Sequence, residues 1–143
     1  MNPSHIIIHH SLTKDSESVS WGAIKKYHTE ELGWKDIGYH FGIERVGNDV
    51  QIFMGRMMNE PGAHCKEKGM NRISLGVCFV GNYDDEDPPV PMWNTGIRLV
   101  RSLVEIFEIQ KGHVHGHYEF APYKSCPGVR FDMDKFREET VTL

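Results

Sequence analysis

The middle of this chain contains Ile73-Ser74-Leu75-Gly76-Val77-Cys78-Phe79-Val80, a nearly continuous apolar run. Strands that expose one side to solvent alternate apolar and polar residues, and this run does not alternate. Continuous apolar runs of this length are typical of strands buried on both faces. We therefore expect a central strand over residues 73–80, with other elements packed against both of its faces.

Four other segments are expected to form strands. His5 to His10 is short and contains three isoleucines, which are β-branched and favour strands. Tyr39 to Val46 alternates, and Gly47-Asn48-Asp49 is a turn that joins it to Val50 to Met54 as a hairpin. Val114 to His117 is the shortest. Together with the central run, these segments predict a single sheet.

Helices are expected both before and after the central run in the sequence. Ser18 or Ser20 can cap a helix that continues to Leu32 and ends at Gly33. Pro91 suits the first turn of a second helix, which is expected to reach about residue 110. The apolar face of this second helix consists of Trp93, Ile97, Val100, Val104 and Phe107.

Two further segments complete the chain. Asp132 can cap a terminal helix that extends to Glu139. Residues 56–72 show no clear period and contain Pro61 and two glycines, so we expect a long loop, and loops of that length tend to be functional. The mixture of strands and helices predicts an α/β or α+β layer fold in which helices cover a central sheet.

Length and composition restrict the class of protein. The 143 residues, with 39% hydrophobic and 25% charged residues, indicate one soluble globular domain over residues 1–143. The net charge of −4 argues against a nucleic-acid partner, because such proteins usually have a basic patch. No stretch approaches the roughly 20 apolar residues of a membrane span. The first residues lack the cationic region of a signal peptide, so we expect synthesis in the cytoplasm and no membrane partner.

The three cysteines are Cys65, Cys78 and Cys126. An odd number argues against a closed disulfide framework. If Cys126 binds a metal ion, Cys65 and Cys78 could form a disulfide or could be two buried free thiols. The sequence leaves both alternatives open, because cysteine is often buried without a bond.

Two histidines and one cysteine suggest a metal site. His9 lies in the apolar run near the start, His117 follows Gly116, and Cys126 lies within Lys124-Ser125-Cys126-Pro127-Gly128. A catalytic zinc ion typically has three protein ligands and keeps its fourth tetrahedral position open for water. Three candidate ligands on separate segments therefore favour an enzyme over a structural zinc domain.

Side-chain direction narrows the choice of ligands only in part. On a strand His9 and His10 point to opposite faces, so both cannot reach one metal ion without distortion. His113, His115 and His117 share a face, and spacing alone does not select one of them. No His-Glu-x-x-His, Gly-x-Ser-x-Gly or phosphate-binding glycine loop occurs in the chain, which argues against a helix-borne metalloprotease site and a serine hydrolase.

Six segments, in this order, match a known family. They are Ile8-His9-His10-Ser11, Asp36-Ile37-Gly38-Tyr39-His40-Phe41, Gly62-Ala63-His64-Cys65, Ser74-Leu75-Gly76-Val77-Cys78-Phe79-Val80-Gly81-Asn82-Tyr83, Gly116-His117 and Lys124-Ser125-Cys126-Pro127-Gly128. The chain resembles the zinc-dependent N-acetylmuramoyl-L-alanine amidases, a family that includes phage lysozymes and animal peptidoglycan recognition proteins. The matches span nearly the whole chain.

The resemblance implies a mixed β-sheet flanked by helices, with a zinc-containing groove on the surface. It implies three Zn²⁺ ligands, which are His9, His117 and Cys126. It also implies that Tyr39 and Lys124 are catalytic and that His64 contacts the substrate. The substrate would be peptidoglycan, at the amide between N-acetylmuramic acid and L-alanine. Glu119 is expected to be a supporting group beside the ligand His117.

Two other functions stay open for this fold. Some relatives bind peptidoglycan without cutting it, and these typically lack the cysteine ligand that Cys126 provides here. A relative can also regulate another protein by binding it, and the sequence does not decide this. We expect a monomer without a separate cell-wall-binding domain. The absence of an export signal resembles a phage or prophage endolysin, which reaches the wall after holin-mediated release or lysis.

Overall fold

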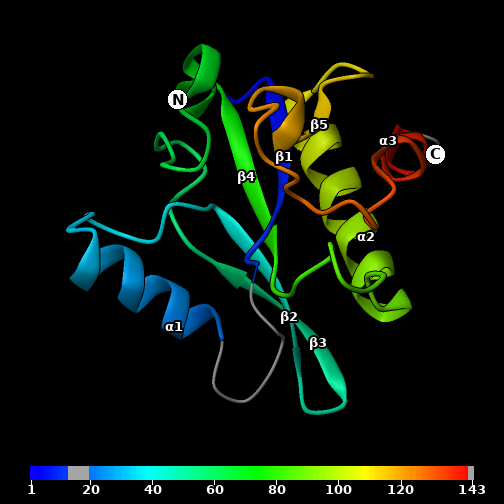
Figure 1. Cartoon of the computed structure of the whole chain (residues 1–143). Coiled ribbons are helices and arrows are strands. Elements are labelled where there is room, and N and C mark those ends of the chain that lie inside the picture. Colours follow the sequence, from blue (N-terminus) through cyan, green and yellow to red (C-terminus); the bar gives the residue numbers. More distant parts are fainter. Residues whose placement is uncertain (13–19, 142–143) are drawn as a thin grey trace.

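The computed structural model describes residues 1–12 and 20–141 and contains one five-stranded sheet. The strands are β1 (His5–His10), β2 (Phe41–Val46), β3 (Asp49–Met54), β4 (Ser74–Phe79) and β5 (Val114–Gly116). Their order is β3-β2-β4-β1-β5, so β4 occupies the centre (Figure 1). Every residue of β4 is buried. The expectation of a central strand that is buried on both faces is therefore confirmed.

The sheet is mixed, as expected from the family resemblance. β1 runs parallel to β4 and to β5, and β2 also runs parallel to β4. β2 and β3 form the antiparallel hairpin that Gly47 and its neighbours predict. Two strands are shorter than expected, because β2 begins at Phe41 instead of Tyr39 and β5 ends at Gly116 instead of His117.

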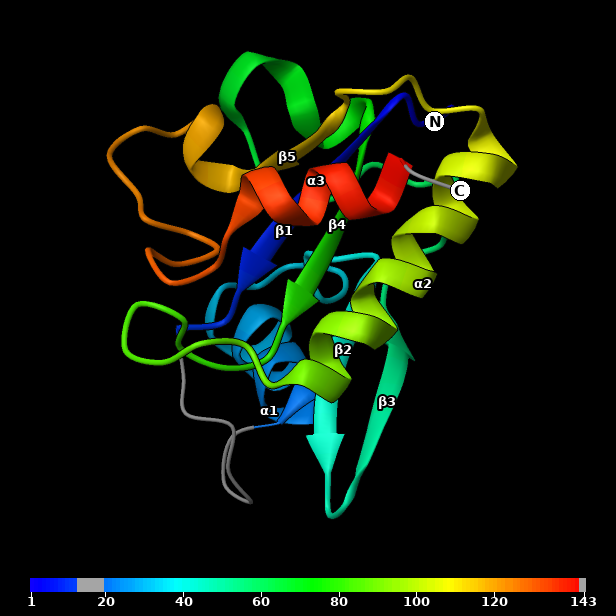
Figure 2. The same cartoon turned by 90° about the vertical axis from the view of Figure 1, so that its right-hand side faces the viewer.

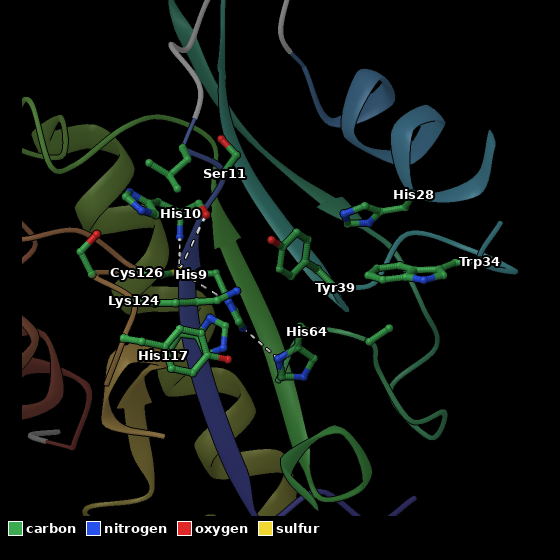
Figure 3. Close-up of a pocket in the computed structure, with 14 residues that line it drawn as sticks. His9, His10, Ser11, His28, Trp34, Tyr39, His64, His117, Lys124 and Cys126 are labelled. Carbon is green, nitrogen blue, oxygen red and sulfur yellow. Dashed lines mark hydrogen bonds between the residues drawn. The ribbon is translucent and has the colours of Figure 1, made fainter. Parts of the chain in front are cut away.

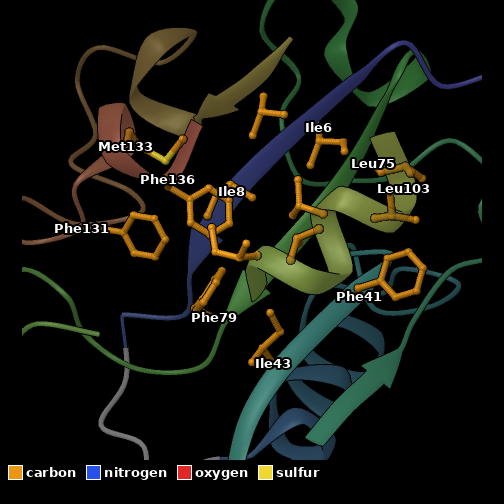
Figure 4. Packing of buried hydrophobic residues seen from close by; sticks show 14 of the residues in the cluster. Ile6, Ile8, Phe41, Ile43, Leu75, Phe79, Leu103, Phe131, Met133 and Phe136 are labelled. Atoms are coloured by element: carbon orange, nitrogen blue, oxygen red, sulfur yellow. The ribbon is translucent and has the colours of Figure 1, made fainter. Parts of the chain in front are cut away.

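One face of the sheet is covered by α2 (Val90–Phe107) and α3 (Met133–Val141), as Figures 1 and 2 show. Ile6 and Ile8 of β1 point into this layer and pack in one cluster with Phe79 and Phe136 (Figure 4). Burial of each such side chain contributes about 1.5–3 kcal/mol. α2 ends at Phe107, short of the expected residue 110, because Glu108 has a left-handed backbone.

The opposite face carries the short helices and the loops. α1 (Trp21–Lys26) is capped by Ser20, whose Oγ accepts a hydrogen bond from the Ala23 N–H. The helix continues as a π-helix, η1 (Tyr27–Glu31). The alternative cap, Ser18, lies outside the described residues. Gly33 has φ 71° after the helix, as its position predicts.

Two short 3₁₀ helices were not expected. η2 (Glu67–Arg72) lies in the segment for which we expected a loop, and η3 (His117–Glu119) begins directly after β5. η2 lacks an apolar period, and its left-handed Lys68 and Gly69 interrupt any regular pattern.

The expected terminal helix is present, and the Asp132 Oδ1 accepts a hydrogen bond from the Lys135 N–H at its start.

The structure also bears on the three cysteines and on the expectation of no membrane span. Cys65, Cys78 and Cys126 are all free thiols and all buried, which is the second of the two alternatives that the sequence left open. Among the described helices, none is both long and apolar enough to span a bilayer.

Candidate metal centre and active site

His9 is placed by the alternation of β1. Ile6 and Ile8 face α2 and α3, so Ile7 and His9 face the other side of the sheet. The ring of His9 is 1% exposed. Its Nδ1 lies 3.6 Å from the Sγ of Cys126 and its Nε2 lies 2.8 Å from the Nδ1 of His64. Each nitrogen of this buried imidazole therefore has a partner on a distant segment.

His117 and Cys126 come from the segment between β5 and α3. Since β1 and β5 are parallel, His9 near the end of β1 and His117 after the end of β5 lie at the same edge of the sheet. The ligand atoms of His9, His117 and Cys126 all lie within 4.8 Å of one another (Figure 3). The structure thus brings together the three residues that the sequence suggested as ligands.

The chemistry of these residues fits a zinc ion. Both nitrogens of His117 are buried without a hydrogen-bond partner among the described residues, which is costly unless another group binds them. Burial, followed by the neighbouring His64 and His117, lowers the pKa of His9 well below 6.5, and burial also lowers the pKa of His117. Two neutral imidazoles and one sulfur are typical ligands of zinc.

The Sγ atom of Cys126 is contacted by a backbone donor. The backbone N–H of His10 donates a hydrogen bond to the Cys126 Sγ at 3.3 Å. Burial raises the pKa of this thiol to about 12, so it is protonated at neutral pH unless a cation stabilises the thiolate. A zinc ion would supply that cation, and its binding would release the proton.

Tyr39 and Lys124 line the same pocket, which has a volume of about 500 Å³. The Tyr39 ring lies 5.1 Å from the His9 ring. Burial, with smaller contributions from Cys78 and Cys126, raises the Tyr39 pKa well above 10, so its hydroxyl stays protonated at neutral pH. Burial is the main cause of the lowered pKa values of His9 and His117, and the positive charge of Lys124 lowers them further. The same charge opposes in part the rise in the pKa of Cys126 that burial causes, so the ammonium of Lys124 lies near all three side chains.

A comparison with known families identifies the chain. The family described as N-acetylmuramoyl-L-alanine amidase matches residues 1–129. The chain belongs to that family. This amidase is therefore an enzyme, a hydrolase that acts on an amide of peptidoglycan, and the fold and activity implied by the resemblance are confirmed.

Individual relatives support the assignment. The endolysin of Escherichia phage T7 is 36% identical over 140 residues, which cover 94% of the amidase and 85% of the relative. Peptidoglycan-recognition protein SC1a of Drosophila melanogaster is 31% identical over 132 residues, covering 88% and 68%. Among solved structures, the N-acetylmuramoyl-L-alanine amidase LysC from Clostridium intestinale superimposes with a TM-score of 0.83 at 28% identity, covering 96% and 85% of the two chains.

His64 takes a position in the amidase that its sequence motif did not reveal. It lines the pocket, but its ring is buried and contacts the candidate ligand His9 through Nδ1. A Cβ atom on Gly62 would lie 2.5 Å from this ring, and one on Gly76 would lie 2.6 Å from it. The two glycines therefore form the slot that holds the ring against His9. Burial lowers the His64 pKa to about 3, so the ring is neutral.

His10, His113 and His115, the other histidines that the sequence considered beside His9 and His117, have their own contacts. The Nδ1 of His10 accepts a hydrogen bond from the Tyr83 N–H. His113 and His115 stack with His5 and do not belong to the metal group. The carboxylate of Glu119 accepts hydrogen bonds from the Gly116 N–H and from Arg137, so it fixes the turn after β5, consistent with a supporting role.

Glu67 is a polar residue near the site that sequence reasoning missed. Its Oε1 lies 3.7 Å from the Nε2 of His117. It belongs to η2, in the segment without a period, and no motif of the sequence points to it. The only available signal was the unusual length of this segment, which the expectation of a functional loop used without selecting a residue.

Proposed function

We propose that this amidase is a zinc hydrolase that cleaves the bond between the lactyl group of N-acetylmuramic acid and L-alanine in peptidoglycan. The proposal rests on the group of His9, His117 and Cys126, whose ligand atoms lie within 4.8 Å of one another at the wall of a pocket. Three protein ligands leave a coordination position for water or substrate, as in catalytic zinc sites.

The roles of the side chains follow from their positions. A zinc ion held by these ligands supplies Lewis acidity toward the carbonyl oxygen and lowers the pKa of a water molecule to about 7. Lys124 stabilises the negative charge that develops on the carbonyl oxygen. Such a donor typically lowers the activation barrier by about 3–4 kcal/mol. The protonated hydroxyl of Tyr39 donates a hydrogen bond to the reacting groups, and it does not act as a base because burial raises its pKa.

The biological role that we propose is that of a phage or prophage endolysin. It is supported by the relative from Escherichia phage T7, which is named an endolysin. Peptidoglycan is the ligand that the names of both endolysin and recognition relatives suggest. We propose that the amidase acts on the cell wall as a monomer, after holin-mediated release or lysis.

The second candidate is a recognition module that binds peptidoglycan without cutting it, because relatives named as recognition proteins share this fold. Digestion of purified peptidoglycan, with zinc and with a chelator, separates the two. We expect new amino termini of L-alanine that disappear with the chelator and return with zinc. Binding without new amino termini would identify a recognition module, and new reducing sugars would identify a glycosidase.

A further inference from the structure

A second group of potential metal ligands adjoins the first. Within residues 1–12 and 20–141 it consists of Cys65, Glu67 and His117, whose ligand atoms also lie within 4.8 Å of one another. It shares His117 with the first group. An imidazole has two nitrogens, and in its neutral form one carries a proton while the other accepts. One nitrogen of His117 can therefore bind a metal ion of the first group while the other serves a different partner.

Glu67 is that partner. The Nε2 of His117 lies 3.7 Å from Oε1 of Glu67, and both side chains are largely buried. With Nε2 directed at the carboxylate, Nδ1 is the nitrogen that is left for a metal ion. Histidines that ligate metals almost always donate their other N–H to a carboxylate, carbonyl or water. The separation exceeds a hydrogen bond of about 2.7–3.2 Å by several tenths of an ångström, so the two side chains must move slightly closer to form one.

The carboxylate of Glu67 is itself held in place. The Tyr123 hydroxyl donates a hydrogen bond to its Oε2 at 2.8 Å, and the Cys65 thiol donates to its Oε1 at 3.7 Å. Tyr123 precedes Lys124, so this contact joins η2 to the segment that carries the proposed catalytic lysine. The carbonyl oxygen of the Asn71 side chain accepts hydrogen bonds from the backbone N–H groups of His64 and Cys65, both at 2.8 Å.

The segment from His64 to Glu67 therefore contacts both ligand histidines from outside. His64 contacts Nε2 of His9, and Glu67 faces Nε2 of His117. Each contact leaves Nδ1 of the ligand for the metal. The two outer partners lie three residues apart on a segment that Asn71 and Tyr123 fix at either end.

We propose that Glu67 is a positioning residue for the zinc ligand His117. Its carboxylate accepts the Nε2–H of His117, fixes the tautomer that presents Nδ1, and is oriented by Tyr123. The proposal rests on the zinc site of the proposed function. One metal ion per chain follows from it, because Nε2 of His117 is used by Glu67 and cannot complete a second site.

Zinc affinity tests the proposal. We would measure the dissociation constant by competition with a chromogenic chelator, and the stoichiometry by metal analysis, for the wild-type chain, Glu67→Ala, Glu67→Gln and Tyr123→Phe. Removal of an outer partner typically costs 10–100-fold in metal affinity, and we expect a loss in that range for Glu67→Ala. Glu67→Gln keeps an acceptor oxygen and should lose less, and Tyr123→Phe should lose less again. Glu105→Ala, on the exposed side of α2, is the matched control and should bind zinc as the wild type does.

The outcomes are distinct. Unchanged zinc affinity in Glu67→Ala overturns the proposal, and unchanged affinity with lost turnover would assign Glu67 to the substrate instead. Two zinc ions per wild-type chain would make the second group a metal site and would also overturn it. A wild-type chain that binds no zinc would refute the proposed function itself. If circular dichroism shows that Glu67→Ala does not fold, Tyr123→Phe decides, because it removes one hydroxyl from an exposed residue.

Discussion

Cys126 connects the chemistry of the site to its burial. Because burial raises its pKa to about 12, the thiolate forms at neutral pH only with help from a cation, and metal binding becomes coupled to proton release. The His10 N–H and the charge of Lys124 assist, but both act on a sulfur that is already placed next to His9. Zinc binding at this residue should therefore be strongly dependent on the sulfur itself.

We predict that Cys126→Ser loses zinc and amidase activity together. A serine hydroxyl is a poor zinc ligand, so the loss in affinity should exceed the roughly 10–100-fold that is typical for an outer partner. Metal analysis after gel filtration and release of L-alanine amino termini from peptidoglycan measure the two effects. Ser102→Ala, at an exposed position of α2, is the control, and it should keep both. Full activity in Cys126→Ser would refute the assignment of this ligand.

Lys124 should act on the reaction and not on the metal. We predict that Lys124→Ala retains one zinc ion but lowers turnover by about 10²–10³, the effect of losing one donor to a developing oxyanion. Turnover at saturating peptidoglycan and the zinc content of the same preparation provide the measurement. Lys111→Ala, an exposed lysine between α2 and β5, should change neither. Unchanged turnover in Lys124→Ala would place this side chain on the surface without a catalytic role.

Single residues were predictable from the sequence to different degrees. His9, His117 and Cys126 were identified because short motifs matched a family, and the structure brings them together. The same match proposed a substrate contact for His64. Its contact with His9 depends on the neighbouring Gly62 and on Gly76, which lies 12 residues further along the chain. Glu67 could not be identified, because the approach of η2 to His117 is a tertiary contact without a local signal.

At the scale of the element, two helical glycines differ in the space that is available for a larger side chain. Gly96 lies in α2, where an added Cβ would lie 2.3 Å from the Cζ of Phe79. The Phe79 ring cannot retreat easily, because Phe131 and Phe136 pack against it. Gly22 lies in α1, where the nearest atom to an added Cβ is the Ser20 Oγ at 3.7 Å.

We predict that Gly96→Ala destabilises the fold while Gly22→Ala stabilises it. Overpacking of a core typically costs 1–3 kcal/mol, which outweighs the gain in helix propensity at Gly96. At Gly22 only the propensity acts, and it favours alanine by up to about 1 kcal/mol. The free energy of unfolding in urea measures both. A stabilised Gly96→Ala variant would show that α2 does not press on the sheet as closely as described.

Elements were predicted well where local chemistry determines them. Ser20 and Asp132 cap their helices through side-chain hydrogen bonds, and the apolar run of β4 needs no alternation because both of its faces are covered. Where the observed elements differ from those predicted, the cause is a backbone conformation that the sequence pattern does not reveal. Glu108 ends α2 with a left-handed conformation that is rare for glutamate, and η2 contains left-handed residues that conceal its helical turns.

At the scale of the whole molecule, the neutral histidines make stability depend on pH. Burial, followed by the stacked His113 and His115, lowers the pKa of His5 to about 4 from 6.5. Burial likewise lowers the pKa values of His10 and His64. Between pH 6.5 and 4 the unfolded chain binds protons at His5 that the folded chain does not. The contribution of the neutral His5 to the free energy of unfolding is therefore fully present above pH 6.5, its pKa in the unfolded chain. It is lost as the pH falls from 6.5 towards 4.

We predict that His5→Asn makes this decrease shallower. The substitution removes the His5 imidazole, whose pKa the folded structure lowers. It leaves His9, His117 and Cys126 unchanged. Urea unfolding at pH 7, 6 and 5, with a chelator present so that acid release of zinc does not contribute, gives the slope for the variant and the wild type. The variant should lose less stability over this range, because the other lowered histidines still act. An equal slope would show that the stack of His5 with His113 and His115 tolerates a proton, and a wild-type stability that rises on acidification would contradict the buried neutral histidines as a whole.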